Sequence, residues 1–586
     1  VSPPDEEHGH RMKTLPVKAF FALGALALLG SLQTKAASFQ PIWSRDGMVA
    51  SSVGPAAAAG ASVLAAGGNA VDAAVASGFA AAVAHPFSSG IGGGLFAVTH
   101  IADGNQTTAL DAREVAPASA DQAWYAANQQ AIRRGPYAVG VPGFVQGLEE
   151  LHRRYGSKPW AELLQPAIDL AENGVPAGHW QYRIMQYAAK TLGDYPETAR
   201  IYLDNGKAPE MGWNMIQKDL ATTLRQIQKK GSAAMTEGAV PAAIEKATKG
   251  AVTAEDMAGY KVKWREPLRG SYRGYEVVSM PPPSSGGVLL LNMLNMLEQH
   301  DLKSLGHGSS TYVHLLSEVM KLAYADRARY LGDADFDDVP VQKLVSEAYA
   351  SQQLARISMD SVLDIKPFNA LPNDEGTTHI SVIDGYGNAV ALTQTINSVF
   401  GSLITVPGTG IVLNNEMDDF SVAPNIPNEW EAIGFDANRV EPGKRPLSSM
   451  TPTLVFEDGK VRMVVGSPMG TTIISSVLQA LLNRIDFGMN AQAAVQASRV
   501  HHQWYPAMLM HEPELAMDVR KRLIEIGHQL RERSIMGAVQ IAEFDPQRCL
   551  FFAGVDGRRD SAAASVNQTA AAQRQTVSCA VPATSP

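Results

Sequence analysis

Cysteine is scarce in this sequence, because Cys549 and Cys579 are the only two examples in 586 residues. Two cysteines exclude a disulfide framework and a cysteine-ligated metal centre. A single disulfide between them is disfavoured, because Cys579 lies in a loose tail rich in Ala, Ser and Gln.

Runs of positive charge are missing as well. The 49 Lys and Arg residues are outnumbered by 58 Asp and Glu residues, which gives a net charge of −9. This balance argues against a nucleic-acid-binding protein. A GxGxxG motif between a strand and a helix is also absent, so a dinucleotide site is not expected. Hydrophobic residues at 45% and charged residues at 18% are typical of a soluble globular protein.

A hydrophobic run near the N-terminus has the organisation of a secretory signal peptide. Basic residues at 12–18 precede an apolar run at 19–32 and a small-residue segment at 34–37. The apolar run is too short to span about 30 Å of hydrocarbon, so a membrane anchor is disfavoured. We assign residues 1–37 to a signal peptide, with 1–11 as an upstream extension and cleavage near Ala36 or Ala37. The mature protein is expected to be secreted, or periplasmic in a Gram-negative bacterium, and free of the membrane.

Helical and strand patterns divide the rest of the chain. Helices are predicted at 56–84, with a turn at Gly67-Gly68-Asn69, and at 140–155, 159–173, 288–299 and 311–331. From residue 378 two hairpins are predicted, one around Gly385-Tyr386-Gly387 and one around Asp458-Gly459. Small or apolar residues at both parities of these strands indicate sheets covered on both faces. A layered α/β sandwich fits this pattern, with a loosely ordered tail from about Asp560.

The segment that carries chemistry begins at Gly376-Thr377, where a polar stretch leads into a strand. The Thr377 hydroxyl can attack the uncrowded peptide bond after Gly376 and form an ester that water then hydrolyses. The cut would leave Thr377 with a free α-amine, of reference pKa about 7.7–8.0, as a base for its own hydroxyl. On these residues alone the alternative stands that a Thr-Thr pair is present for its β-propensity.

Three further segments supply groups that such a nucleophile needs. Residues 413–420 bring acids and amides together, residues 444–452 join two serines to a basic pair, and residues 466–472 end a strand and open a helix. Backbone N–H groups at a helix start suit a developing oxyanion. Each segment alone is also compatible with a solvated turn or a cap.

Many motifs in one order make the sequence resemble the γ-glutamyltranspeptidase family over nearly all of the mature chain. These motifs lie at 54–55, 66–73 (Ala-Gly-Gly-Asn-Ala-Val-Asp-Ala), 89–94, 111–114 (Asp-Ala-Arg-Glu), 281–287 (Pro-Pro-Pro-Ser-Ser-Gly-Gly), 324–327 (Tyr-Ala-Asp-Arg) and 501–504. The resemblance implies a four-layer αββα fold of N-terminal-nucleophile (Ntn) hydrolases. It implies a precursor cut between Gly376 and Thr377 into a large subunit (38–376) and a small subunit (377–586), which form a heterodimer.

The resemblance also implies roles for single residues. Thr377 resembles the nucleophile and Thr395 the hydroxyl that orients it. The α-carboxylate of a γ-glutamyl substrate would be held by Arg113, Ser448 and Ser449, and its α-ammonium by Asn397, Glu416 and Asp419. A zwitterion needs opposite charges at two fixed points, and Arg113 offers a bidentate fork for the carboxylate. Met469 and Gly470 would donate the oxyanion N–H groups, and no cofactor or metal is implied.

Two features are specific to this chain. Family members usually have two glycines where Met469-Gly470 stands, so we expect the Met469 side chain near the acyl group and no glycine-only backbone angle there. The loop at 421–438 resembles a lid over the glutamyl pocket, with Trp430 as its closing aromatic residue, although a surface loop with a packed tryptophan is the alternative.

The implied activity is γ-glutamyl transfer from glutathione or a related donor to an amino acid, a peptide or water. A glutaryl (cephalosporin) acylase on the same fold is the nearest alternative, but its substrate has no amine for Glu416 and Asp419 to bind. An inactive periplasmic relative is a second alternative, which the presence of Thr377 and Arg113 disfavours. His501-His502 lacks third and fourth ligands at suitable spacing, so a structural pair is expected there.

Overall fold

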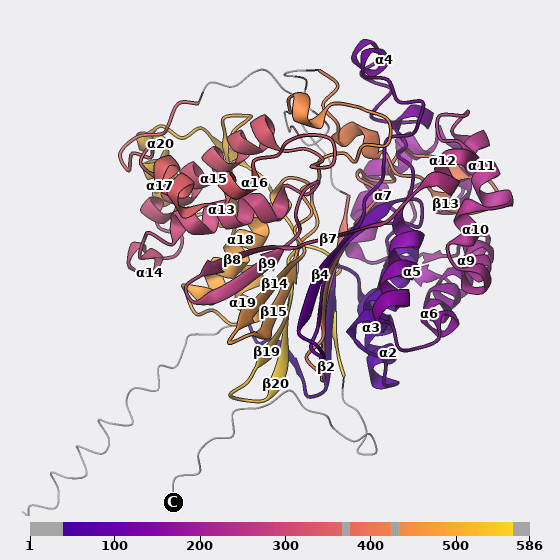
Figure 1. Cartoon of the computed structure of the whole chain (residues 1–586), viewed down its shortest axis with the longest axis horizontal. Coiled ribbons are helices and arrows are strands. Elements are labelled where there is room, and N and C mark those ends of the chain that lie inside the picture. The colour runs from indigo at the N-terminus through magenta and orange to yellow at the C-terminus, as the bar shows by residue number, and fades with distance from the viewer. Residues whose placement is uncertain are drawn as a thin grey trace, which may run out of the picture. The chain divides into compact units, whose positions relative to one another are not determined.

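The computed structural model describes residues 39–365, 376–423, 426, 428, 431 and 434–566. The predicted signal peptide, the predicted lid residue Trp430 and the cysteine Cys579 lie outside the described residues. Cys549 is disulfide-bonded, so the expectation against a disulfide is wrong. All helices and strands labelled in Figure 1 belong to the unit that begins at Pro41.

Two large antiparallel sheets, each of seven strands within the described residues, form the centre of this unit. Sheet A has the order β1 (Ile42–Ser44), β20 (Leu550–Val555), β19 (Gln540–Asp545), β15 (Lys460–Gly466), β14 (Thr453–Glu457), β9 (Tyr275–Ser279), β8 (Leu268–Tyr272). Sheet B has the order β21 (Ala562–Ser565), β2 (Gly47–Ser51), β10 (Thr378–Asp384), β11 (Ala389–Thr395), β3 (Gly94–Ile101), β4 (Gln106–Ala112), β7 (Lys263–Arg265). Both predicted hairpins are confirmed, as β10–β11 and β14–β15.

Helices cover the outer face of each sheet, which gives the four-layer αββα sandwich (Figure 1). Against sheet B pack α2 (Gly54–Ala65), α3 (Ala70–Ala84) and α5 (Phe144–Tyr155). Against sheet A pack α13 (Gly286–Leu297), α18 (Thr472–Ile485) and α19 (Ala491–Gln496). Outside these lie α4 (Gln122–Ala127), α6 (Trp160–Asn173), α7 (His179–Leu192), α8 (Pro196–Tyr202), α9 (Lys218–Lys230), α10 (Ala233–Thr236), α11 (Ala239–Ala247), α12 (Ala254–Gly259), α14 (Leu302–Leu305), α15 (Ser310–Tyr330), α16 (Val341–Leu344), α17 (Glu347–Leu354) and α20 (Met517–Ile526).

Shorter elements connect these layers. They are β5 (Val175–Pro176), β6 (Asn214–Met215), β12 (Thr405–Val406), β13 (Ile411–Val412), β16 (Val500–His501), β17 (Leu509–His511), β18 (Leu530–Glu532) and the 3-10 helices η1 (Pro136–Ala138), η2 (Glu416–Asp419) and η3 (Asp436–Asn438). No helix in the described part of the chain has both the length and the apolar character needed to cross a membrane.

Strand residues of both parities are buried because sheet B is covered on both faces. In β11, Val390 and Leu392 join the core under α2 and α3, whereas Ala389 and Ala391 join the core that includes sheet A. Successive side chains of the strand therefore point alternately into two hydrophobic cores, and neither set faces water. The predicted two-sided covering is confirmed.

The turn predicted at Gly67-Gly68-Asn69 ends α2 and starts α3. Asn69 caps α3, because its side chain accepts from the N–H groups of Val71 and Asp72, while the Asp72 carboxylate accepts from the Asn69 N–H. This reciprocal capping box satisfies backbone donors that a helix start otherwise leaves unpaired. Gly67 has a φ of 81°, which glycine adopts readily.

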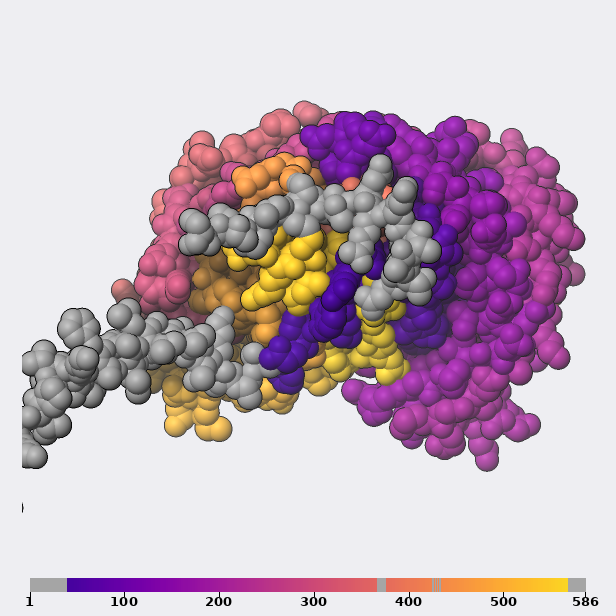
Figure 2. Space-filling view, turned by 90° about the horizontal axis from the view of Figure 1, so that it is seen from below, coloured from indigo at the N-terminus to yellow at the C-terminus, as the bar shows by residue number. Residues whose placement is uncertain are grey.

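The predicted loose tail begins too early in the sequence. Residues 562–565 form β21, which pairs with β2 at the edge of sheet B. The backbone ladder and the bond from the Val566 N–H to Ser44 Oγ (2.8 Å) hold this stretch although its side chains are small. Residues 567–586 lie outside the described part. Figure 2 shows yellow C-terminal residues beside indigo N-terminal ones, in agreement with the β1–β20 and β2–β21 pairs.

Candidate active site

One cavity gathers most of the residues that the sequence singled out. It is lined by Arg113, Arg327, Thr377, Thr395, Asn397, Glu416, Asp419, Asn428, Ser448, Ser449, Met450, Gly470, Thr471 and Ile473. Of the predicted site residues in the described part, Gly376 and Met469 are not in its lining. Gly376 directly precedes Thr377, and Met469 directly precedes Gly470 of the lining.

Thr377 and Thr395 meet because their strands are paired neighbours. Thr377 directly precedes β10, Thr395 ends β11, and the register sets Thr378 opposite Gln394. Their hydroxyl oxygens are 3.2 Å apart. The backbone N–H of Asn397 donates to Thr395 Oγ1 at 2.8 Å, which holds the Thr395 hydroxyl beside Thr377 Oγ1.

The backbone at the Gly376–Thr377 junction is tightly confined. Thr377 is buried and has a φ of 129°, in a region that a β-branched residue rarely adopts. A Cβ atom added at Gly376 would lie 1.9 Å from the carbonyl oxygen of Asn397, so only glycine fits. Arg559 Nη1 donates to the Thr377 carbonyl oxygen at 3.0 Å. The junction therefore combines a strained residue with neighbours that hold it in place.

Charged groups of both signs also meet in the lining of the cavity. Arg113, directly after β4, donates to the carboxylates of Glu416 and Asp419 in η2, and its Nε donates to the Pro446 carbonyl at 3.3 Å. Arg113 Nη1 is also 3.7 Å from the buried Glu114 carboxylate. The groups predicted to bind a carboxylate and an ammonium thus bind each other in this structure.

Burial dominates the protonation of these acids. It raises the pKa of Glu114 to about 7 against the opposing pull of Arg113, and it raises the pKa values of Glu416 and Asp419. Burial disfavours the charge of Arg113, but Glu416 and Asp419 outweigh it, so the pKa of Arg113 rises. Arg113 remains the fixed positive charge of the site.

The serines of the 444–452 segment are positioned by the Pro-Pro-Pro-Ser-Ser-Gly-Gly motif. The Ser448 N–H donates to the Pro283 carbonyl at 2.8 Å, and the Ser285 N–H donates to the Ser448 carbonyl at 2.8 Å. Arg327 on α15 donates to Ser285 Oγ at 3.0 Å and to Ser449 Oγ at 3.3 Å. The motif therefore holds both serines and a second arginine at the cavity.

The turn at Met469-Gly470 differs from the expectation. Met469 has a φ of 94° and Gly470 a φ of 51°, so methionine does adopt an angle that favours glycine. The Met469 side chain is buried in the core on the α2–α3 side of sheet B and does not line the cavity. Burial of the thioether offsets the backbone strain and keeps the side chain out of the cavity. Among the described residues, neither of the two N–H groups donates to another backbone carbonyl.

His501 and His502 are buried beside a short strand. His501 Nδ1 is 2.8 Å from Ser475 Oγ and its Nε2 is 3.0 Å from Gln503 Oε1, while His502 Nδ1 accepts from the Trp504 N–H. Neither belongs to a group of metal-capable ligands within the described ranges. They bind neighbouring protein groups, as expected of a structural pair.

Sequence reasoning assigned no role to three residues of the site. Arg327 and Glu114 lie in quoted motifs, Tyr-Ala-Asp-Arg and Asp-Ala-Arg-Glu, whose charged ends were a usable signal. Arg559 lies in Arg558-Arg559-Asp560, where only the arginine pair hinted at a function. Its contact with Thr377 joins positions 182 residues apart, which no local pattern reveals.

Two facing sheets between helical layers, with a threonine at the entry of a central strand, define an Ntn hydrolase. The family model described as Gamma-glutamyltranspeptidase matches residues 56–566. The chain belongs to the γ-glutamyltranspeptidase family and is an enzyme of the Ntn class.

Individual relatives include more than one kind of acyl-group enzyme. The glutathione hydrolase proenzyme of Escherichia coli is 40% identical over 526 residues, covering 88% of this chain and 90% of the relative. The acylase ACY 1 proenzyme of a Pseudomonas species is 38% identical over 526 residues, covering 87% and 92%. The structure of cephalosporin acylase from Bacillus halodurans superposes with a TM-score of 0.82 at 28% identity, covering 92% of this chain and 99% of that one.

Proposed function

We propose that the protein is a γ-glutamyltranspeptidase and glutathione hydrolase that transfers a γ-glutamyl group through an ester on Thr377. The observation that carries this proposal is the contact of Arg113 with Glu416 and Asp419 in the cavity that Thr377 also lines. A γ-glutamyl group ends in a carboxylate and an ammonium, and these are the two charges that such a cluster complements.

Substrate binding then becomes an exchange of ion-pair partners. The α-carboxylate takes the Arg113 guanidinium, with Ser448 and Ser449 as neutral donors, and the α-ammonium takes Glu416 and Asp419, with Asn397 as an acceptor. Each buried charge of the free protein keeps an opposite charge in the complex, so none is left unpaired. A ligand that carries only one of the two charges leaves part of the cluster uncompensated.

Maturation precedes catalysis in this proposal. Thr377 Oγ1 attacks the Gly376 carbonyl carbon, the peptide nitrogen leaves as the Thr377 amine, and water hydrolyses the resulting ester. The products are a large chain that ends at Gly376 and a small chain, 377–586, that starts at Thr377. The positive φ of Thr377 and the confined Gly376 support this site of cleavage, because the cut releases local strain.

The catalytic cycle uses the new terminus. The Thr377 amine accepts the hydroxyl proton while Oγ1 attacks the γ-carbonyl carbon of the donor, and the N–H groups of Met469 and Gly470 face the developing oxyanion. The amine returns the proton to the leaving amine, here cysteinylglycine when glutathione is the donor. An amino acid, a peptide or water then attacks the ester and frees Thr377.

A glutaryl acylase is the second candidate, favoured by the similarity to cephalosporin acylase and to acylase ACY 1. A glutaryl group has no amine, so Glu416 and Asp419 would bind nothing in its complex. The acid pair therefore supports the γ-glutamyl donor.

The test compares γ-glutamyl and glutaryl anilides with the purified protein. The full-length chain should give two bands on a gel, the smaller beginning Thr-Thr-His-Ile-Ser, and Thr377→Ala should stay whole and inactive. Asp419→Asn should lower kcat/KM for the γ-glutamyl anilide by roughly 30-fold or more, because a lost buried charge contact costs about 2–5 kcal/mol. Arg113→Gln should lower kcat/KM for both anilides. An equal decrease in kcat/KM for both anilides in Asp419→Asn would assign Asp419 a structural role and contradict its role in binding the amine.

We also propose that the protein is exported. The support is the basic, apolar and small-residue order of residues 12–37. Cell fractionation of the native host should find the processed protein outside the cytoplasm with a new N-terminus near residue 37, and a cytoplasmic protein that keeps residues 12–37 would contradict this.

A further inference from the structure

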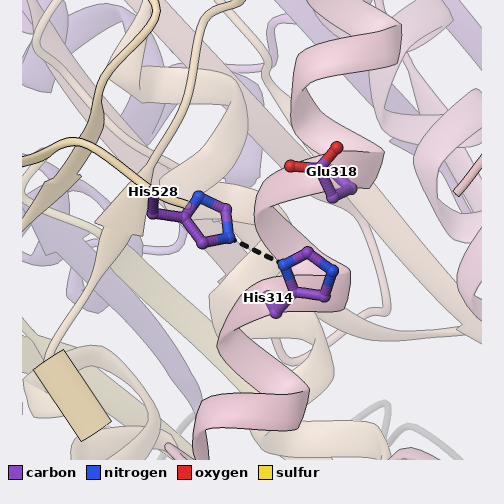
Figure 3. Close-up of side chains that lie close together, drawn as sticks. All are labelled: His314, Glu318 and His528. Atoms are coloured by element: carbon purple, nitrogen blue, oxygen red, sulfur yellow. Dashed lines mark hydrogen bonds between the residues drawn. The ribbon is translucent and has the colours of Figure 1, made fainter. Parts of the chain in front are cut away.

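A group of three buried side chains away from the substrate cavity has the composition of a metal site. His314 and Glu318 lie one turn apart on α15, and His528 faces them from the segment between α20 and β18 (Figure 3). His314 Nδ1 and His528 Nε2 are 2.7 Å apart. One ligand atom from each residue lies within 4.8 Å of the others, and all three residues are buried.

The hydrogen bond of His314 Nε2 determines the tautomer of this ring. His314 Nε2 is 2.8 Å from the Ser358 carbonyl oxygen, which can only accept a hydrogen bond. The hydrogen of a neutral His314 therefore sits on Nε2, and Nδ1 turns its lone pair toward His528. Metal-bound histidines show this arrangement, with the second nitrogen donating to a backbone carbonyl.

Glu318 retains capacity for a further partner. Its Oε1 accepts from Lys321 Nζ at 2.7 Å and its Oε2 accepts from the Leu363 N–H at 2.9 Å. An ionised carboxylate has about four lone-pair sites, so two bonds leave room for a cation. Lys321 also donates to the Leu363 carbonyl at 3.0 Å, which holds its positive charge near the group.

We propose that His314, Glu318 and His528 bind a divalent transition metal such as Zn²⁺. Two imidazole nitrogens and one carboxylate oxygen form a ligand set that zinc accepts, with a fourth position for water. Zinc–nitrogen bonds of about 2.0–2.1 Å in tetrahedral geometry place two nitrogens about 3.3 Å apart, so the rings need to separate by only about 0.6 Å. The hydrogen on His528 Nε2 moves to Nδ1 of the same ring by exchange with solvent as the metal enters, so both imidazoles bind the metal as neutral ligands.

The site joins parts of the chain on opposite sides of Thr377. His314 and Glu318 precede it and His528 follows it, and α15 also carries Arg327 of the substrate cavity. A bound metal would tie α15 to the segment after α20 and so raise thermal stability. The ligand set stands whether or not the chain is cut before Thr377.

The sharpest test uses substitutions with opposite expected signs. Tag-free, full-length protein is freed of metal with a chelator and titrated with ZnCl₂ by calorimetry, and bound zinc is counted after gel filtration. We expect about one zinc per chain and a higher Tm. His528→Gln and Glu318→Gln should each weaken binding at least about tenfold. Lys321→Gln should strengthen binding, because it removes a positive charge beside the metal, and no folding defect produces a gain in affinity.

Controls separate this site from adventitious binding. His179→Gln, at an exposed histidine that begins α7, should leave zinc binding unchanged. Co²⁺ in place of zinc should give visible absorption bands that are lost in His528→Gln. The proposal is overturned if the wild-type protein retains no zinc, if His528→Gln and Glu318→Gln bind zinc as tightly as the wild type, or if Lys321→Gln weakens zinc binding. In each of these outcomes His314 and His528 are a hydrogen-bonded pair and nothing more.

Discussion

Single residues at the candidate site are constrained by contacts that reach far along the sequence. Thr377 is held through its hydroxyl by Thr395 and through its carbonyl by Arg559. Arg559 in turn lies 5.0 Å from the ring of Trp180. The nucleophile candidate is thus fixed at both ends, by one residue of the neighbouring strand and one near the end of the chain.

Substitution of Arg559 should slow cleavage of the chain. Arg559→Met removes a charge-assisted hydrogen bond of about 1.5–3 kcal/mol, so the cut before Thr377 should slow by roughly ten- to a hundredfold. Arg559→Lys, which keeps the charge, should fall between Met and the wild type. The fraction of cut chain is followed on gels over time, and cleavage of Arg559→Met at the wild-type rate would show that the contact is incidental.

Met469 offers a test of backbone strain. Met469→Ala removes the buried side chain but keeps a residue with a Cβ at a φ of 94°, whereas Met469→Gly removes the side chain and the strain together. Both should lower stability, yet the glycine variant should be the more stable of the two by about 1 kcal/mol. Urea unfolding in an uncut Thr377→Ala background measures this, and the reverse order would mean that the turn is unstrained.

The site could be predicted residue by residue only where a motif carries it. Arg113, Glu416, Asp419 and the serine pair were found through motifs, and the structure brings them to one cavity. The direct pairing of Arg113 with the two acids could not be predicted, because it depends on η2 folding back onto the end of β4. Only the expected position of the Met469 side chain is wrong, since this side chain packs into the core and does not line the cavity beside Gly470.

At the scale of elements, local signals sufficed where both partners are close in sequence. The Asp458-Gly459 and Gly385-Tyr386-Gly387 turns fixed two hairpins, and the Asn69 cap fixed the start of α3. The order of strands in the sheets could not be predicted, because β2 pairs with β10 across more than 300 positions and with β21 across more than 500. Strand β21 was missed for a related reason, since Ala-Ala-Ala-Ser has no strand signal and is ordered by its partner.

Deletion of β21 should therefore matter more than its sequence indicates. A chain that stops after Asn567 keeps β21 and is the matched control, because both truncations remove Cys579, the only other cysteine beside the disulfide-bonded Cys549. A chain that stops after Asp560 leaves the backbone of β2 unpaired along one edge and should show a lower Tm and a lower yield of processed enzyme. Equal yield and Tm for both truncations would mean that the β2–β21 ladder contributes little.

On the scale of the whole molecule, buried histidines link stability to pH. Burial lowers the pKa of His379 to about 3, and its two nitrogens bind the hydroxyls of Thr393 (2.8 Å) and Ser381 (3.0 Å). His85 and His501 are shifted in the same direction, chiefly by burial, to about 3 and about 4. These rings stay neutral in the folded protein while the unfolded chain takes up protons near pH 6.5.

The contribution of His379 is complete above pH 6.5 and is lost as the pH falls toward 3. Between pH 6 and pH 4 the stability of the wild type relative to His379→Gln should therefore fall by about 1.4 kcal/mol per pH unit. Glu114 acts in the opposite sense, because its raised pKa gives stability that is complete below about 4.5 and is lost as the pH rises through about 7. Urea midpoints are measured at several pH values for the Thr377→Ala chain with and without His379→Gln. Parallel curves of stability against pH for these two proteins would contradict the prediction.

The strand order of sheet B decides what a nick before Thr377 can do to the molecule. Strands β2, β3, β4 and β7 precede the nick and β10, β11 and β21 follow it, and the two sets alternate as β21-β2-β10-β11-β3. Strands of the large and the small subunit are therefore interleaved in one sheet, and the two subunits are hydrogen-bonded along β21–β2, β2–β10 and β11–β3. Dilution alone is not expected to dissociate the two subunits, because all three strand pairs would have to break at the same time. Specific activity should be the same at nanomolar and micromolar enzyme concentrations. Subunits that are separated in denaturant should not refold into active enzyme when they are mixed, whereas the continuous chain folds before it is cut.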